Sequence, residues 1–478
     1  MKIPARQSSV IALLVAGALF MEQLDGTVIA TALPQMANTF EVAPVDLNIG
    51  ISAYLLTVAV FIPASGWVAD RVGARTTFRM ALMVFMAASI GCAFSRSLGQ
   101  FVVFRALQGV GGAMMVPVGR MVVIRAVPKN ELVRALSFIS MPALIGPMLG
   151  PPLGGLIVTY ADWRWIFFVN LPIGVLGIAL ATLFIPDLRE ETPPLDVRGF
   201  LLSALGLGGV ILGTAMVGRR IAPPETVAAC ILIGAVSLAG YAVHAVRVER
   251  PLLDLRLLRF ATFEAGIVGG TFFRFGVGAS AFLLPLMLQL GFGLDALRSG
   301  LITFSGAVGA LAVKPLARVI LRRFGFRRLL ILNGLLASLV LMAYGLFTAT
   351  TPHVVLFIVL MCGGFLRSLQ FTSLSALTYA DLESRQIGAA TAMASVAQQV
   401  SVSLGVATGA MVLEISELIA QHARPQTADF AAAFVVVGLV SLGSVALLLR
   451  LPGTAGDEIS GRIVPRAGEG TLVSRKPA

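Results

Sequence analysis

Two acidic residues lie inside the first apolar segment of the chain, and they are the residues best suited to carry chemistry. Glu22 and Asp25 are three positions apart, so a helix places them on nearly the same face. A charge at the centre of a bilayer costs about 2.5–3.5 kcal/mol on insertion scales, and such residues usually line a cavity or a proton path. Burial and a neighbouring carboxylate both favour the protonated form. The pair therefore predicts a group that binds and releases a proton.

Four arginines also lie within apolar segments. A structural ion pair between Arg105 and Asp25 is the alternative to a proton-handling role for both. A cationic substrate or a neighbouring arginine would displace the proton, and this competition would couple two fluxes. Arg274 and Arg367 lie in the second half of the chain, where each either neutralises a carboxylate or binds an anionic substrate. Arg120 is near the end of its segment, where its side chain can reach the lipid headgroups.

Other side chains within apolar segments are weaker candidates for a substrate cavity, because aromatic and methionine stripes more often belong to a core. The three histidines lack metal-ligand spacing. No glycine-rich nucleotide-binding loop is present, and no nucleophile lies near a base as an enzyme would require. We therefore expect no metal, no cofactor and no catalysis. The cavity candidates are Met114, Met115, Met141, Phe138, Phe273, Gln289 and Gln370.

The elements that must position these residues are membrane helices. Of the 478 residues, 57% are hydrophobic and 13% are charged, whereas soluble domains carry about 25% charged residues. A membrane helix needs roughly 20 apolar residues. The sequence therefore predicts an all-α polytopic membrane protein and excludes a soluble enzyme, a disulfide scaffold and a disordered chain. Fourteen apolar runs fall at 8–32, 47–69, 77–95, 99–124, 134–158, 164–186, 199–218, 226–246, 262–290, 299–319, 328–348, 353–379, 387–413 and 429–451.

The basic residues indicate which side of the membrane each loop faces. With the N-terminus taken as cytoplasmic, 26 of the 36 Lys and Arg residues fall in cytoplasmic segments, 6 on the other side and 4 within spans. Cytoplasmic loops are enriched in Lys and Arg, so we expect both chain termini in the cytoplasm. The net charge of +12 does not indicate a nucleic-acid partner, since no aromatic stacking platform accompanies it.

A repeated basic turn divides the chain into halves. Asp70-Arg71-Val-Gly73-Ala-Arg75 follows the second run, and Arg322-Arg323-Phe-Gly325-Phe-Arg327 follows the tenth. In each turn, glycine can adopt the left-handed backbone conformation. Pairing spans 2 and 10 predicts six-helix bundles at 1–190 and 251–452, two extra helices at 191–250 and a disordered tail at 453–478. Duplicated halves that rock about a midplane site are typical of secondary transporters.

Several stretches resemble motifs of the major facilitator superfamily, in particular its fourteen-helix drug:proton antiporter branch. They keep the family's order and spacing over most of the first 175 residues. The resemblance implies the major facilitator fold and a role for Arg105 in proton transfer or in holding the first-helix acid. The stretches are Leu24-Asp25-Gly-Thr27 through Pro34, Gly66 through Arg75, Arg105-Ala-Leu-Gln108-Gly109-Val-Gly111, Gly146-Pro-Met-Leu-Gly150-Pro151-Pro-Leu-Gly154-Gly155 and Trp163 through Gly174.

The resemblance assigns a latch to the first basic turn. Asp70, Arg71, Gly73 and Arg75 are implied to close the cytoplasmic side in the outward-open state. An acid in this position can accept hydrogen bonds from a helix N-terminus or an arginine. The alternative is a plain basic turn. The second turn has Arg322 where the first has Asp70, so any acidic part of the latch exists in one half only.

The fifth span carries the antiporter motif. Gly146, Gly150 and Gly154 are four residues apart and form one stripe for close helix packing. Pro151 removes a backbone donor and bends the helix. By resemblance this helix, with Gly155 also in the motif, seals the central cavity against proton leakage. Generic membrane packing is the alternative.

The sequence thus predicts a proton-coupled secondary transporter that exports amphipathic organic compounds by alternating access. Its expected partners are a small-molecule substrate, protons and membrane lipids, and we expect a monomer in a bacterial-type inner membrane. A facilitator-type carrier of another cargo or direction, such as a lipid, siderophore or nutrient, is the main alternative. A membrane-embedded enzyme lacks a reactive cluster, and a channel does not fit duplicated halves.

Overall fold

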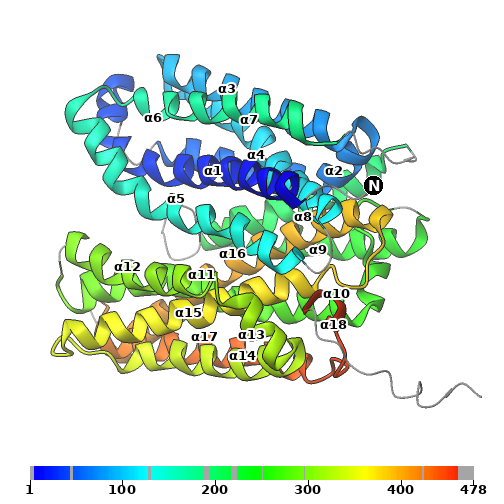
Figure 1. Cartoon of the computed structure of the whole chain (residues 1–478). Coiled ribbons are helices and arrows are strands. Elements are labelled where there is room, and N and C mark those ends of the chain that lie inside the picture. The colour runs from blue at the N-terminus through cyan, green and yellow to red at the C-terminus, as the bar shows by residue number, and fades with distance from the viewer. Residues whose placement is uncertain are drawn as a thin grey trace, which may run out of the picture.

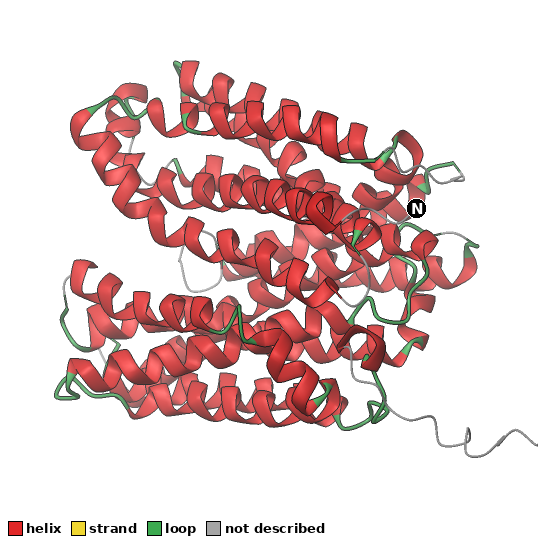
Figure 2. Ribbon diagram, viewed as in Figure 1, coloured by secondary structure: helices red, strands yellow, loops and turns green. Residues whose placement is uncertain are grey.

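The computed structural model describes residues 5–42, 47–127, 131–186, 194–216, 223–249, 251–294, 296–421 and 425–460. Every regular element within these ranges is a helix (Figure 2). Twelve helical segments are long and apolar enough to cross a membrane, and one bent pair of helices makes a thirteenth. A further helix of 29 residues, Leu132–Tyr160, has Arg134 as its one charged residue. With it, the predicted number of fourteen spans is confirmed.

The first half of the chain forms a bundle of six spans (Figure 1). Within it, α1 packs along α5, and α4 packs against α2 and α3. The short α6 continues into α7, so these two helices make one span. The helices are α1 (Ala5–Phe40), α2 (Asn48–Val72), α3 (Ala74–Phe94), α4 (Leu98–Ala126), α5 (Leu132–Tyr160), α6 (Trp165–Phe168) and α7 (Asn170–Phe184).

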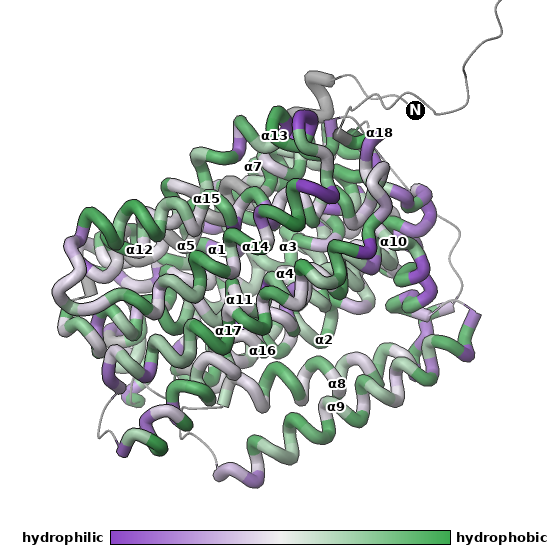
Figure 3. The backbone as a smooth tube through the Cα atoms, turned by 90° about the horizontal axis from the view of Figure 1, so that it is seen from below, coloured by the Kyte–Doolittle hydropathy of each residue, from purple (hydrophilic) through white to green (hydrophobic). Residues whose placement is uncertain are grey.

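Two extra helices, α8 (Val197–Met216) and α9 (Pro224–Arg247), form a hairpin beside the bundles (Figure 3). Glycines allow their close approach: a Cβ on Gly209 would lie 2.7 Å from the Cys230 carbonyl oxygen. The hairpin packs against α2 and the long helix α16 (Ile387–Ala420). Thr214 of α8 shares a hydrogen bond of 2.6 Å with Ser403 of α16. Through α8, the two-helix hairpin thus lies against both halves of the chain.

The second half of the chain repeats the six-span order. Its second span is bent by 60° between α12 and α13. Pro315 lies at this break and cannot continue the helical hydrogen bonding. The elements are η2 (Leu255–Arg259), α10 (Ala261–Glu264), η3 (Ala265–Gly269), α11 (Gly270–Leu286), η4 (Met287–Gly291), α12 (Ala296–Ala312), α13 (Ala317–Phe324), α14 (Phe326–Ala343), η5 (Tyr344–Leu346), α15 (His353–Leu377), η6 (Ser384–Gln386), α16, α17 (Thr427–Leu448) and α18 (Asp457–Ser460).

The two predicted turn glycines adopt the backbone conformation expected of them. Gly73 has φ 102° between α2 and α3, and Gly325 has φ 72° between α13 and α14. Side chains with a Cβ rarely adopt these angles. The repeat therefore relates the second and third spans of the first half to the tenth and eleventh spans of the chain.

The bundles are joined at one end of the molecule and separate at the other. We call the joined end, where Arg71, Arg125 and Arg322 lie and where α1 begins, the basic end (Figure 1). One hydrophobic cluster here contains side chains of both bundles, among them Val133 and Leu377. Toward the opposite end, the described core divides into one cluster for each bundle.

The start of the predicted tail is a correction to the sequence analysis. Residues 453–460 were expected to be disordered, but they include α18, and Ala455 and Ile459 are buried in the cluster at the basic end. These two apolar side chains let the segment pack against the cluster, although its glycine-rich composition is typical of disorder. Residues 461–478 lie outside the described ranges.

Candidate functional site

The Asp25 carboxylate is the centre of a buried polar cluster in the first bundle. Arg105 of α4 donates a hydrogen bond from Nη1 to Asp25 Oδ2 at 2.7 Å, which is also a salt bridge. Asp25 is 4% exposed and Arg105 is 0% exposed. A pair removed from water in this way is stable only if the protein supplies further hydrogen bonds.

Neutral side chains from two more helices supply those hydrogen bonds. The amide nitrogens of Gln108 on α4 and Asn170 on α7 donate to Asp25 Oδ1 at 2.9 and 2.8 Å. Both amides also donate to the Ser89 hydroxyl of α3, at 2.9 and 3.2 Å. Four helices, α1, α3, α4 and α7, therefore converge on one carboxylate, and both of its oxygens accept hydrogen bonds.

Glu22 lies in a different environment one turn away on α1. Its Oε1 accepts a hydrogen bond of 3.3 Å from the Tyr54 hydroxyl of α2. Its Oε2 is buried and has no hydrogen-bond partner among the described residues. Arg105 lies over the Tyr54 ring, 4.5 Å from its centroid. Tyr54 therefore connects the Asp25 cluster to Glu22, but Glu22 has no cation bonded to it within the described chain.

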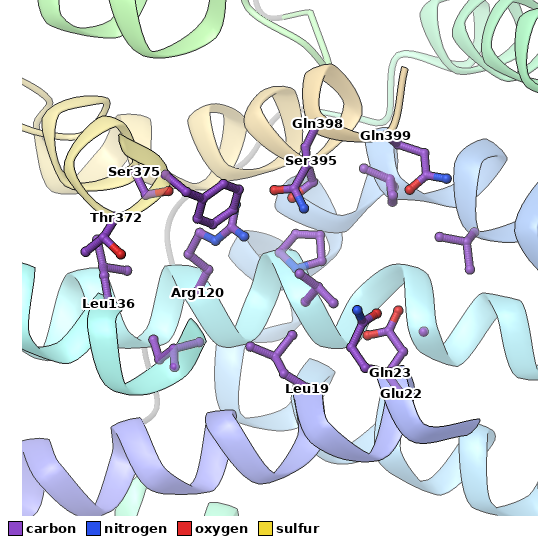
Figure 4. Close-up of a pocket in the computed structure, with 17 residues that line it drawn as sticks. Leu19, Glu22, Gln23, Arg120, Leu136, Thr372, Ser375, Ser395, Gln398 and Gln399 are labelled. Carbon is purple, nitrogen blue, oxygen red and sulfur yellow. The ribbon is translucent and has the colours of Figure 1, made fainter. Parts of the chain in front are cut away.

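Glu22 lines a pocket between the two bundles with an empty volume of about 930 Å³. Helices α1, α2, α4 and α5 of the first bundle form one wall, and α15 and α16 of the second form the other. Apolar side chains such as Val58 and Phe371 alternate with polar ones, a combination typical of ligand pockets. Figure 4 shows Glu22 and Gln23 of α1 across the pocket from Ser395, Gln398 and Gln399 of α16.

The predicted latch residue Asp70 lies where the two bundles meet at the basic end. Arg125 of α4 forms a salt bridge of 2.9 Å with Asp70 Oδ1. The Arg125 guanidinium also donates to the Ser384 carbonyl oxygen of η6, at 3.0 and 3.2 Å. A Cβ on Gly388 of α16 would lie 2.3 Å from Asp70 Oδ2. The carboxylate is thus held between α4 and the first turn of α16, whose free backbone N–H groups favour negative charge.

Gly73 ends α2 in the same turn, so it fixes the direction in which α3 leaves the latch. Arg71 is exposed and Arg75 is half-buried. Both engage in interactions, as do Asp70 and the neighbouring Trp67. The four predicted latch residues therefore occupy one turn, but the arginine that reaches across to the other bundle is Arg125.

The antiporter motif of α5 forms the contact surface for α1. A Cβ added to Gly146 would lie 2.8 Å from Gln23 Cβ, and one on Gly150 would lie 2.7 Å from Thr27 Cβ. On Gly154 it would meet the Thr31 hydroxyl. Distances below 3.0 Å leave no room for a methyl group. The glycine stripe holds α5 against the face of α1 that carries Gln23, Thr27 and Thr31. Gly155 points elsewhere, with nothing within 4 Å of an added Cβ.

Three of the predicted cavity residues are part of the helix packing instead, which corrects the sequence analysis. Met115 and Gln370 are 0% exposed. Met115 belongs to the hydrophobic cluster at the basic end. Gln370 accepts a hydrogen bond from the Asn333 amide and donates one to the Leu330 carbonyl oxygen. Arg274 donates to the Gly266 carbonyl oxygen of its own span at 3.0 Å.

Gln289 and Arg367 also lie away from the central pocket. Gln289 is exposed within η4, and Arg367 lines a smaller pocket inside the second bundle. The placement of the Pro151 side chain lies outside the described residues. Within the described ranges, no group of three or more His, Cys, Asp and Glu side chains could hold a metal ion.

Sequence reasoning missed the partners that complete each cluster. Gln108 is three residues after Arg105 on one helix face, a spacing that could have indicated a shared contact. Asn170 stands inside an apolar run, where an amide needs a partner. Arg125 and Tyr54 gave no comparable signal, because a basic residue at a loop and a tyrosine in a span are both common.

Known proteins similar to the chain are membrane transporters. The model of the Major Facilitator Superfamily matches residues 15–406 and 266–466. The putative multidrug resistance protein MdtD of Pectobacterium atrosepticum is 37% identical over 466 residues, which is 97% of both chains. The protein of the same name from Escherichia coli is 37% identical over 441 residues, which is 92% of both chains.

Two solved structures share the fold. The proton:xylose symporter XylE, bound to 6-bromo-6-deoxy-D-glucose, has a TM-score of 0.67 at 16% identity, over 96% of this chain and 99% of its own. The human organic anion transporter MFSD10 has a TM-score of 0.64 at 17% identity, over 94% of this chain and 100% of its own. At these identities the likeness concerns the arrangement of helices.

Proposed function

The chain belongs to the Major Facilitator Superfamily, and from this premise we propose that it exports amphipathic organic compounds in exchange for protons. The similarity to proteins named as putative multidrug resistance proteins supports drugs or metabolites as cargo. The observation that carries the proposal is Glu22, an acid in the pocket between the bundles with one oxygen unbonded among the described residues.

The two first-helix acids have different tasks in this mechanism. Asp25 is bound by Arg105 and two amides, so it fixes the position of Arg105. Glu22 exchanges the proton, since its burial without a bonded cation favours the neutral form and a cationic cargo favours the charged form. Arg120 of α4 lines the same pocket but forms no salt bridge with Glu22 among the described residues. Arg105 is stacked on Tyr54, so its positive charge lies next to the tyrosine that donates to Glu22. Competition of proton and cargo for Glu22 couples the two fluxes.

The latch and the antiporter motif then control access to Glu22. Arg125, held by Asp70 of its own bundle, joins the bundles at the basic end through the Ser384 carbonyl oxygen. We assign this end to the cytoplasm because 26 of the 36 Lys and Arg residues belong to that side. The conformation described above is thus open away from the cytoplasm. The glycine stripe of α5 closes the wall beside α1. We infer a monomer in a bacterial inner membrane with both termini cytoplasmic.

The driving force is sufficient for export. One proton that moves down 100 mV yields about 2.3 kcal/mol. At about 1.36 kcal/mol per factor of ten, this energy sustains roughly a 50-fold gradient of a neutral cargo. A monovalent cation exchanged for one proton moves no net charge and is driven by the pH gradient alone.

Reconstitution into liposomes with an imposed pH gradient tests the proposal. Cationic, neutral and anionic amphipathic compounds are offered in turn, and proton movement is followed with a pH-sensitive dye. We expect cationic compounds to release protons from the wild type, whereas E22Q binds cargo but releases no protons. Q23E, which adds an acid at the adjacent pocket residue in the E22Q background, is expected to restore part of the release.

Transport that persists after the gradient is collapsed would refute proton coupling. Proton release at the wild-type level in E22Q would refute the role of Glu22. A cargo that moves only inward would instead favour the carrier of another direction.

A further inference from the structure

A second, smaller pocket lies entirely inside the second bundle, apart from the pocket that contains Glu22. Its walls come from α11, α14 with η5, α15 and α17. The polar side chains that line it are those of Arg367, Tyr344, Ser280 and Ser441, and Phe273 is among the apolar ones. No part of the transport mechanism proposed above uses this pocket.

The four helices around this pocket are the repeat equivalents of those around Asp25. With the extra hairpin left out, α11, α14, α15 and α17 are the first, third, fourth and sixth spans of the second half. The Asp25 cluster is built by α1, α3, α4 and α7, the first, third, fourth and sixth spans of the first half. In each half an arginine of the fourth span, Arg105 or Arg367, points into this frame.

The two halves differ in the side chains that surround this arginine. In the first bundle an acid of the first span pairs with Arg105. In the second bundle the first span contributes Phe273 and Ser280, and the pocket lining contains no carboxylate. Arg367 forms no hydrogen bond or ion pair with any described residue, and it lies in the middle of α15. A guanidinium within a membrane span is costly unless an anion or water compensates it.

The neighbouring hydroxyls add donors to the same place. Tyr344 is 8% exposed and lines the pocket together with Arg367, and its hydroxyl bonds to no described residue. The Ser441 hydroxyl is likewise free among the described residues, whereas Ser280 donates to the Val277 carbonyl oxygen. A guanidinium carries donors only. The pocket therefore offers a cation and two hydroxyls but no negative charge.

We propose that this pocket binds an anionic group, which pairs with the arginine of the fourth span as Asp25 pairs with Arg105 in the first bundle. Arg367 pairs with the anion, and the hydroxyls of Tyr344 and Ser441 donate to it. The group is either a small inorganic anion or the carboxylate of an organic molecule, because both offer acceptor oxygens or negative charge to the same donors. This inference does not depend on proton coupling or on the direction of transport.

Thermal unfolding of the full chain in lipid nanodiscs tests the proposal, because a ligand that binds the folded state raises the Tm with its concentration. Sodium chloride and sodium benzoate are titrated separately, and each titration is repeated with R367Q so that the effect of ionic strength can be subtracted. We expect a saturable rise in Tm with at least one of the two anions. The R367Q variant should weaken the apparent affinity about tenfold or more, the loss of a charged hydrogen-bonding partner.

Further variants separate binding from folding. R367K keeps the charge and should retain part of the shift, and Y344F keeps the ring and should weaken it about threefold. R318Q removes an exposed arginine of α13 in the same bundle and should leave the shift unchanged. A rise with chloride alone identifies an inorganic anion, and a rise with benzoate alone identifies a carboxylate. No rise with either anion, or an equal rise in R367Q, would overturn the proposal.

Discussion

The Asp25–Arg105 pair allows a quantitative test of the buried cluster. Removal of one partner from a buried ion pair costs about 3–5 kcal/mol, because the other charge is left uncompensated. The two single variants should differ within this range. In R105Q the carboxyl of Asp25 can take up a proton, so we expect a loss of about 3 kcal/mol. In D25N the arginine cannot lose its charge and is 0% exposed, so we expect about 5 kcal/mol.

The double variant separates the pair from the rest of the network. In D25N/R105Q no charge is uncompensated, and the amides of Gln108 and Asn170 can still bond to the new side chains. We therefore expect the double variant to be more stable than D25N alone, although both carry the same change at position 25. The free energy of unfolding is measured by titration with sodium dodecyl sulfate in mixed micelles, with the fluorescence of the buried Trp163 as the signal.

A matched control comes from a surface pair. Asp162 and Arg164 lie 3.1 Å apart with side chains 52% and 31% exposed, and exposed pairs contribute about 0–1 kcal/mol. D162N should therefore cost less than about 1 kcal/mol. The reasoning fails if D25N costs no more than D162N. It also fails if the losses of the two single variants add up in the double variant, since charges that compensate each other cannot give additive losses.

Two further pairs of variants probe the helix contacts that the family resemblance implied. D70N removes the anion that holds Arg125 beside Ser384, and R125Q removes the guanidinium that contacts Ser384. Each should therefore increase about fivefold the labelling of a cysteine at Ser375 from the basic end, as about 1 kcal/mol less stabilisation of the closed state predicts. The assay uses a background without the native cysteines, and opposite effects of the two variants would contradict a shared latch. G150A should lower the free energy of unfolding by about 1–3 kcal/mol through overpacking against α1. G155A is the control, because its added Cβ has nothing within 4 Å, and it should lower this free energy by far less. Equal losses in the two variants would contradict the role of the glycine stripe in packing.

The sequence allowed the fourteen spans, the repeat and the family to be predicted, because these depend on local patterns. A span is defined by some 20 successive apolar residues. A turn glycine is defined by the positive φ that it must adopt, as Gly73 and Gly325 do. The bend of 60° in the tenth span was not predicted. Pro315 was visible in the sequence, but whether a proline bends or ends a membrane helix depends on neighbouring helices that satisfy the freed backbone groups.

The candidate site was predictable only where one segment contains both partners. Glu22 and Asp25 share a helix, but their environments differ because Asn170 and Ser89 come from helices far away in the sequence. Periodicity does not show which helix lies opposite a given face. For the same reason Met115 and Gln370 could not be distinguished from cavity residues, although both are buried in helix packing.

The assignment of proton exchange to Glu22 rather than Asp25 follows from the energies of their two protonation states. A coupling group must have neutral and charged states close enough in free energy for a cargo or a change of access to reverse their order. Protonation of Asp25 would leave the Arg105 charge without its partner, at the cost of several kcal/mol for a broken buried pair. Protonation of Glu22 disturbs one hydrogen bond of 3.3 Å from Tyr54, which is worth about 1.5–3 kcal/mol to a charged acceptor. The binding of a cation in the pocket, or the entry of water when the bundles rock, supplies energies of that size. The protonation state of Glu22 can therefore change within each cycle without breaking the Asp25–Arg105 pair.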